Sequence, residues 1–159
     1  MAAVQRVLRA QVFGGSGMSQ HFTLLGLVTA GRDLGGRRFE VRALVDDVGA
    51  LVRAVLRAGA PRAQVRVTDL SAGRLPALAV LADAFADAER VTVVDDAGRA
   101  SGRGYYTGVC FKVFAGRAGR LTEVGDGGFV DWTQRLLANR KERLLISGLG
   151  VEMLAAQLS

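Results

Sequence analysis

Cysteine and histidine are almost absent from this chain of 159 residues, which contains one of each, Cys110 and His21. A single cysteine excludes an internal disulfide and suits a reducing compartment, so we expect a cytoplasmic protein. A Ser-His-Asp triad would depend on His21, and Cys110 lies among apolar residues, so packing roles are favoured for both. The acidic residues have no histidine or cysteine alongside them, so the sequence implies no metal site and no cofactor.

Long apolar runs are also missing, although half of the residues are hydrophobic. No run reaches the roughly 18 uninterrupted apolar residues of a membrane-spanning helix. Near the N-terminus, Arg6 and Arg9 interrupt the apolar pattern, which therefore does not match an export signal. A chain of this length buries roughly 70% of the surface that its unfolded form exposes. We therefore expect a single domain over residues 1–159 that does not bind a membrane.

Lysine is scarce as well, and 19 of the 21 basic residues are arginines. The net charge is +6, and arginine is suited to bidentate contacts with phosphate or carboxylate. The arginines are spread from Arg6 to Arg143, often near acids, and the densest group, NRKER at 139–143, is only five residues long. The charge therefore permits an RNA-binding surface without indicating one.

The apolar spacing switches between helix and strand periods along the chain. Strands are predicted over 21–30, 63–70, 89–96, 106–115, 119–125 and 143–148, and helices over 39–58, 75–88, 132–140 and 151–158. At the N-terminus, Val4, Val7, Leu8 and Val12 predict a helix that ends at a flexible glycine-rich turn, both within residues 1–17. This order predicts the α/β (α+β) class, with a mixed, mainly antiparallel sheet flanked by helices.

The stretch GRGYYTGVCFKVFAG, residues 102–116, is close to a glycine-rich phosphate loop. That motif must lead into a helix, but the residues after it alternate as a strand, so the phosphate-loop interpretation fails. A glycine turn remains that presents Tyr105 and Tyr106 where a strand begins, so one ring can line a pocket while the other packs. The alternative that both rings have only a packing role remains open. The strand should form a hairpin with residues 121–124 through the short AGRAGR turn.

Three short motifs follow one another in the second half of the chain. They are Tyr-Tyr-Thr-Gly at 105–108, Gly-Gly-x-x-Asp at 127–131, and Gly-x-Glu-x-Leu at 150–154, and the second begins within a turn predicted over Gly125–Gly128. Over residues 101–154 the chain resembles the C-terminal half of the class II catalytic core of histidyl-tRNA synthetases and of their paralogue, the regulatory subunit of ATP phosphoribosyltransferase. Residues 46–73 more weakly resemble the helix and strand that follow the second class II motif. The resemblance implies a synthetase-like core and places Tyr105 and Tyr106 in the histidine-binding motif.

Departures from the family pattern fall on its charged positions. Ser101 stands where the resemblance implies an arginine that assists histidine activation, and Gly104 stands where it implies an aspartate. Phe129 and Val130 replace an Arg-Tyr pair, and Met153 replaces the arginine that covers the adenine of ATP. A thioether supplies no cation over a base and binds no phosphate. We therefore expect no aminoacyl-adenylate formation and assign no catalytic residue.

Two other stretches bear on ligand binding, one as an alternative explanation of an acidic residue and one as a further candidate site. Asp131 and Gln134 have the spacing of a helix capping box, which explains the acid without a ligand. TAGRDLGGRR at 29–38 is an anion-binding candidate, because Arg32 and Arg37 lie at a glycine-rich strand-to-helix turn.

The sequence thus favours a non-catalytic, regulatory synthetase-like protein that binds a small polar ligand, such as histidine or a nucleotide. The predicted ligand-binding residues are Arg103, Tyr105, Tyr106, Thr107, Gly127 and Gly128, with Arg32 and Arg37 as anion contacts. A small enzyme that uses an adenylate or phosphoribosyl substrate, and an RNA-binding relic of a synthetase, stay as alternatives.

The C-terminal segment suggests a protein partner in addition. Val151, Leu154, Ala155 and Leu158 recur at helical spacing and are available to the sheet or to a second copy. We expect a homodimer or a synthetase-like partner protein.

Overall fold

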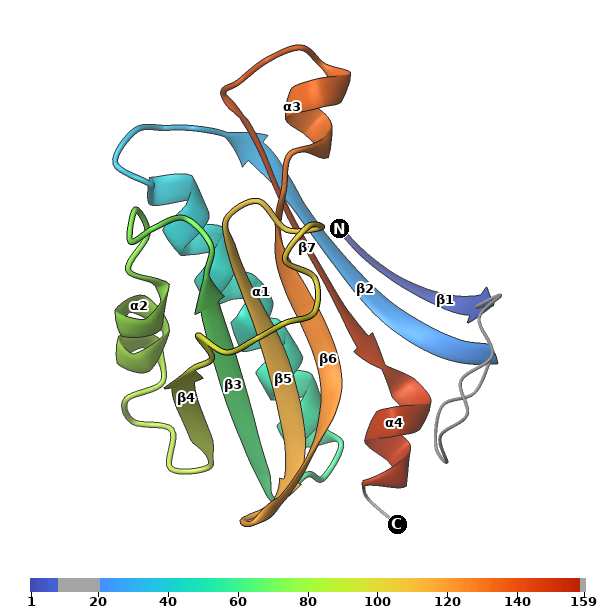
Figure 1. The fold of residues 1–159 in the computed structure, drawn as a ribbon. Helices are drawn as coiled ribbons and strands as arrows, with labels where there is room; N and C mark the ends of the chain where they lie inside the picture. The colour runs from blue at the N-terminus through green and yellow to red at the C-terminus, as the bar shows by residue number, and fades with distance from the viewer. Residues whose placement is uncertain (9–20, 158–159) are drawn as a thin grey trace.

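A single seven-stranded sheet organises the computed structural model, which describes residues 1–8 and 21–157 (Figure 1). The strands lie in the order β1-β2-β7-β6-β5-β3-β4. The strands are β1 Ala2–Leu8, β2 His21–Arg32, β3 Arg62–Asp69, β4 Val91–Asp95, β5 Val109–Arg117, β6 Arg120–Val130 and β7 Glu142–Gly150. The helices are α1 Arg38–Arg57, α2 Ala77–Ala84, α3 Trp132–Leu136 and α4 Val151–Ala156.

Strand pairing confirms the predicted fold class. Only β3 and β4 run parallel, and every other neighbouring pair of described strands is antiparallel. Strands β5 and β6 form the predicted hairpin, which contains an irregularity in register at Val113 and Phe114. The sheet is mixed and mainly antiparallel, and helices flank it, as the order of predicted elements indicated.

Helix α1 covers one face of the sheet, which we call the covered face. Its apolar residues recur at intervals of three and four, so Leu44, Val48, Leu51 and Val55 form one stripe, and all four are completely buried. The stripe packs against alternate residues of the central strands, including Phe111. Helix α2 and the buried Leu81 extend the same core toward β4.

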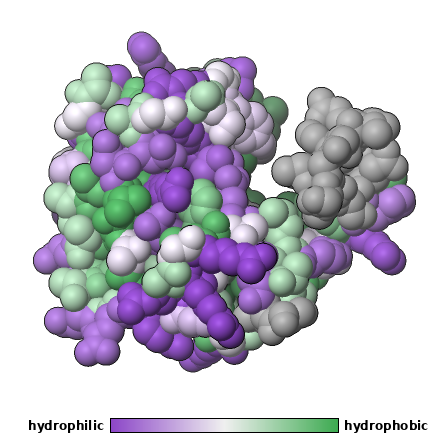
Figure 2. Space-filling model, turned by 60° about the horizontal axis from the view of Figure 1, so that its bottom comes forward, coloured by the Kyte–Doolittle hydropathy of each residue, from purple (hydrophilic) through white to green (hydrophobic). Residues whose placement is uncertain are grey.

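The opposite face, which we call the open face, has no long helix over its central strands. There the connection between β4 and β5, residues 96–108, crosses in front of β5 and β6 (Figure 1). Helix α3 lies beyond one end of the sheet and α4 near the other. Seen from the end where α4 lies, hydrophilic residues alternate with smaller hydrophobic patches over the surface (Figure 2).

The predicted N-terminal helix is wrong over its described part. Residues Ala2–Leu8 form the edge strand β1 and pair with β2 from Leu27 back to His21. The free edge of β2 satisfies the backbone groups of this segment, which outweighs a weak helical spacing of valines. The predicted glycine-rich turn at 14–17 lies outside the described residues.

The predicted turn over the Gly125–Gly128 region is also wrong, because these residues continue strand β6 as far as Val130. Their glycines serve close packing between strands instead of chain reversal. The helix that follows is short, and Asp131 takes the N-cap position without any side-chain capping hydrogen bond. Asp131 instead forms an ion pair with Arg135, and Gln134 donates to the carbonyl oxygen of Glu142, so the predicted capping box is wrong.

The C-terminal helix forms as predicted, and part of its apolar surface is used within the chain. Leu154 is buried in the core, while Val151 is 39% exposed. Glu152 ties α4 to β2, because its carboxylate accepts hydrogen bonds from the Thr23 amide and hydroxyl. Leu158 lies outside the described residues, and self-association stays a prediction. No helix in the described part of the chain is long and apolar enough to cross a membrane.

Candidate functional site

The two tyrosines of the Tyr-Tyr-Thr-Gly motif lie on the open face of the sheet. Strand β6 alternates, so Gly128 faces this side, while Gly127 faces the covered side under Phe111. The ring of Tyr106 packs directly on Gly128, where a Cβ atom would lie 2.6 Å from the ring. Tyr105 packs edge-on against Tyr106, at 5.0 Å between ring centroids. The structure therefore brings the predicted tyrosines and Gly128 together, with the ring lying on the glycine.

Beneath these rings, a buried arginine holds an aspartate of β6. The Arg99 side chain is 1% exposed, and its Nη2 donates to both carboxylate oxygens of Asp126, each at 2.9 Å. Its Nε donates to the carbonyl oxygen of Ser101 at 2.7 Å. The Tyr106 hydroxyl lies 3.2 Å from Asp126 Oδ1, in position to donate a hydrogen bond. Arg99 Nη1 is buried and has no hydrogen-bond partner among the described residues.

The electrostatics of this cluster follow from burial and from the Asp126 charge. Burial and the neighbouring carboxylate raise the pKa of Tyr106 far above its ordinary value, so this hydroxyl stays protonated as a donor. Burial alone would lower the pKa of Arg99, but the hydrogen bonds and charge of Asp126 outweigh burial and raise it. The cluster is therefore a fixed arrangement of one cation, one anion and one neutral hydroxyl.

Asp126 is the part of this cluster that reaches solvent. Its side chain is 39% exposed, and it lies opposite Lys112 of β5 and Gly148 of β7 in the register of the sheet. Lys112 is engaged with Glu123 at 2.7 Å. An oriented, partly exposed carboxylate is able to accept hydrogen bonds from a cationic or other donor group.

The other predicted residue of this loop, Arg103, is used in holding the loop itself. Its Nε donates to the Arg99 carbonyl oxygen and its Nη2 to the Ala97 carbonyl oxygen. The side chain thus braces the 96–108 segment from outside, whereas Arg99 braces it from inside. Ligand binding by Arg103 stays a prediction.

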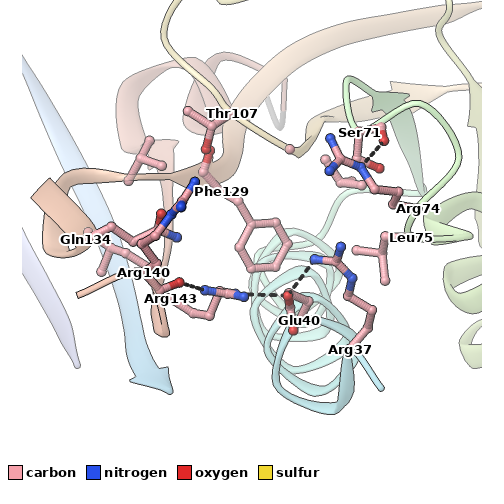
Figure 3. Close-up of a pocket in the computed structure, with 14 residues that line it drawn as sticks. Arg37, Glu40, Ser71, Arg74, Leu75, Thr107, Phe129, Gln134, Arg140 and Arg143 are labelled. Carbon is pink, nitrogen blue, oxygen red and sulfur yellow. Dashed lines mark hydrogen bonds and ion pairs between the residues drawn. The ribbon is translucent and has the colours of Figure 1, made fainter. Parts of the chain in front are cut away.

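Thr107 and Arg37, predicted for different roles, line one cavity at the end of the sheet. The cavity has a volume of about 270 Å³ and lies between the N-terminus of α1, the β3–α2 connection and the ends of β5 and β6 (Figure 3). Its lining residues are Arg37, Glu40, Ser71, Arg74, Leu75, Thr107, Gly108, Val109, Phe129, Val130, Gln134, Arg140, Arg143 and Leu144. Phe129 projects from the covered side of β6, whereas Asp126 projects from the open side and does not line this cavity.

Arg32, the other predicted anion contact, does not line this cavity. It pairs with Glu142 at 2.9 Å across the β2–β7 ladder, and its side chain is mostly exposed. Of the two predicted anion contacts, Arg37 alone lines the cavity.

Several residues of these sites have no signal in the sequence. Arg99 lies two positions before Ser101, outside the register of the resembled motif, and only the fold turns it under Tyr106. Asp126 sits in a predicted glycine turn, whose true strand geometry aims it at Arg99. Arg74 comes from the β3–α2 connection, and it meets Arg140 and Arg143, which precede and begin β7, only in the tertiary structure. The density of arginine in NRKER was a usable signal for the last two.

Met153 lies in the last of the three motifs, at the position where the resemblance implies the arginine that covers adenine. Met153 is partly buried against the hydrophobic core, and a Cβ atom at Gly150 would lie 3.5 Å from its side chain. Within residues 1–8 and 21–157, no three histidine, cysteine, aspartate or glutamate side chains group closely enough to hold a metal ion. Burial raises the pKa of the Cys110 thiol, which favours its inert protonated form.

The architecture was compared with protein families, curated proteins and solved structures. No protein-family model and no curated protein matches the chain. Among solved structures, apo histidyl-tRNA synthetase from S. aureus superposes with a TM-score of 0.66 over 87% of this chain. This chain has a histidyl-tRNA synthetase-like fold.

Two further structures share this histidyl-tRNA synthetase-like fold. One is an ATP phosphoribosyltransferase regulatory subunit/histidyl-tRNA synthetase from Bacillus halodurans, with a TM-score of 0.68 over 99% of this chain. The other is a histidine–tRNA ligase subunit from Alicyclobacillus acidocaldarius, with a TM-score of 0.64 over 99%. Each of the three is 16% identical in sequence to this chain. This chain spans 40% of the S. aureus protein, 58% of the Bacillus halodurans protein and 68% of the Alicyclobacillus acidocaldarius protein.

Proposed function

We propose that this protein is a non-catalytic, synthetase-like protein that binds a small amino acid-like ligand on the open face of its sheet. The observation that carries the proposal is Asp126, a carboxylate fixed by Arg99 and Tyr106 and left 39% exposed at the middle of β6. The α-ammonium of an amino acid is the complementary group. Histidine is the first candidate, because the structural neighbours are named as histidyl-tRNA synthetases.

Preorganisation supports binding at this carboxylate. Arg99 is held through two oxygens of Asp126 and one of Ser101, so the carboxylate cannot rotate freely. A site whose polar groups are already fixed loses little entropy when a ligand arrives. Tyr105, which is half exposed, supplies an aromatic wall next to the carboxylate cluster.

The packing of Met153 supports the absence of adenylate chemistry. The resemblance places an adenine-covering arginine at this position, but here the side chain is apolar and turned against the core. Ser101, at the other arginine position, is exposed and carries no charge. We propose that the protein senses its ligand and passes that state to a partner protein, as the regulatory-subunit name of one neighbour suggests.

Calorimetric titration with two matched ligands tests the site without altering the protein. L-Histidine should bind, and N-acetyl-L-histidine, which lacks the ammonium charge, should bind about ten-fold more weakly or worse. Trp132 fluorescence gives a second measure of binding, because the Trp132 and Tyr105 ring centroids lie 5.6 Å apart and Trp132 is 41% exposed. Equal affinity for the two ligands, or binding of neither, would contradict the assignment to Asp126.

A variant pair localises the binding. Asp126→Asn should lose histidine affinity, whereas Asp95→Asn, an exposed aspartate at the end of β4, should keep it. Circular dichroism spectra confirm that both variants are folded before titration. In parallel, ATP–pyrophosphate exchange with histidine should stay at background, and clear exchange would overturn the non-catalytic part of the proposal.

A further inference from the structure

A second and separate feature is the arginine-lined cavity at the end of the sheet. Four arginines line it, Arg37, Arg74, Arg140 and Arg143, and Glu40 is its one carboxylate among the described residues. The lining residues carry four positive charges and one negative charge, and Asp33, which lies outside the lining and pairs with Arg143, reduces the excess from three to two. Like charges gathered around a small concave space repel one another, so the arrangement is stabilised by an anion between them.

Glu40 offsets one of these positive charges and positions two of the arginines. The residue is 4% exposed, and its Oε1 accepts from Arg37 Nη1 and from Arg143 Nε, each at 3.0 Å. Figure 3 shows Arg37 and Arg143 approaching Glu40 from opposite sides, with the ring of Phe129 between them. Arg143 is further fixed by Asp33 at 2.7 Å, so most of its donors are occupied.

The remaining arginines keep their charged ends available. Arg74 donates Nε to the Ser71 carbonyl oxygen, which leaves both terminal nitrogens without a protein acceptor among the described residues. Its loop is rigid, because Asp69 accepts from the amides of Ser71 and Gly73. Arg140 is exposed and forms no ion pair with the part of the chain that the structure describes. Guanidinium groups held in this manner offer paired N–H donors to tetrahedral oxyanions.

The first turn of α1 adds to the same field. Arg37 is the N-cap of this 20-residue helix, and it forms no side-chain capping hydrogen bond. The amides of the first turn therefore lack the usual capping acceptor, and the helix dipole is positive at this end. Leu75, Phe129 and Leu144 add apolar surface to the lining, which can contact the body of a ligand.

We propose that this cavity binds the phosphate group of a small organic phosphate. The charge excess favours a dianion over a single carboxylate, and a volume of about 270 Å³ admits a small molecule, not a nucleic acid strand. The proposal does not depend on the amino acid site, because Asp126 projects from the other side of β6.

Glycerol 3-phosphate and glycerate, a carboxylate of similar size, are the matched probes. Calorimetry at physiological ionic strength should give measurable binding of glycerol 3-phosphate and inorganic phosphate, and at least about ten-fold weaker binding of glycerate. Equal binding of glycerate and glycerol 3-phosphate would overturn the phosphate assignment. Absence of any phosphate binding to the unaltered protein would overturn the site itself.

Three variants distinguish binding in the cavity from a general attraction of anions to a basic protein. Arg74→Ala and Arg140→Ala should each weaken glycerol 3-phosphate binding about ten-fold or more, since each removes a charge-assisted contact. Arg117→Ala removes the same charge at the exposed end of β5 and should leave affinity unchanged. An equal loss in Arg117→Ala contradicts the proposal. Histidine titration of Arg74→Ala should match that of the unaltered protein, so each site is tested independently.

Discussion

The two faces of strand β6 use the same run of glycines for different purposes. On the covered face, Gly127 lets Phe111 and Ser147 close over the strand, and the result is dense apolar packing. On the open face, Gly128 lets Tyr106 lie flat on the strand, next to the charged pair of Arg99 and Asp126. A glycine motif alone therefore does not indicate a ligand pocket, because the neighbouring side chain decides what fills the space.

The arginines divide in the same way, into residues that hold the structure and residues available to a ligand. Arg99 is buried, makes two contacts with one carboxylate and holds a loop to the sheet. Arg74 and Arg140 are exposed around a cavity and form no ion pair within the described chain. A basic composition thus contains both kinds of residue, and only the partners of each arginine separate them.

The largest effect should come from breaking the charged pair on the open face. Asp126→Ala leaves the buried Arg99 without its carboxylate, and we expect the free energy of unfolding to fall by about 3 kcal/mol. Urea unfolding followed by circular dichroism measures it. Asp95→Ala is the matched control and should change stability by less than about 0.5 kcal/mol. A loss as small as the control's would mean that the open-face pair does not hold the loop.

The packing on the covered face is tested at its glycine. In Gly127→Ala the new Cβ would lie 2.6 Å from both the Phe111 ring and Ser147 Cβ, so the strands must separate. Overpacking of this kind costs about 1 to 3 kcal/mol of unfolding free energy. Gly98→Ala, where nothing lies within 4 Å, is the control and should be nearly neutral in thermal unfolding. Comparable stability of the two variants would show that β6 has room on its covered face.

A buried acid makes the covered face sensitive to pH. Burial raises the pKa of Asp47, and hydrogen bonds from the Thr29 and Ser147 hydroxyls only partly offset this. The folded state therefore binds this proton more tightly than the unfolded chain. Its contribution to stability is fully present below the unfolded-state pKa and is lost as the pH rises through the folded-state pKa.

Replacing Asp47 by asparagine should remove this part of the pH dependence. Urea unfolding across the acidic range should show a smaller fall in stability with rising pH for Asp47→Asn than for the unaltered protein. Asp46→Asn, on the exposed side of the same helix turn, should nearly keep the original profile, because the Asp46 charge makes only the smallest contribution to the raised pKa of Asp47. Identical profiles for all three proteins would place the titration elsewhere.

The smallest effect on stability should come from the cavity arginines. Arg140→Ala removes an exposed side chain with no ion pair in the described structure, so unfolding free energy should change by less than about 0.5 kcal/mol. Differential scanning calorimetry without added anions measures this. A large loss would make Arg140 a structural residue like Arg99 and would weaken the contrast between the two groups.

The sequence by itself determined much of the architecture. The spacing of Leu44, Val48, Leu51 and Val55 predicted α1, and alternation predicted most strands, because these periods place apolar side chains on one side of each element. The short glycine-containing turn predicted the β5–β6 hairpin. The resemblance carried by Tyr105 to Leu154 led to the histidyl-tRNA synthetase-like fold that the solved structures share.

Only the tertiary structure decided the edge strand, the length of β6 and which residues meet at the two proposed sites. Ala2–Leu8 is a strand because β2 offers it an unpaired edge, and that edge lies some twenty residues away in the chain. Asp126 meets Arg99 across 27 positions, and Arg37 meets Arg143 at Glu40 across more than 100. Local propensity acts over a few residues, whereas ion pairs and cavities form between segments that the fold brings together, so no local pattern records them.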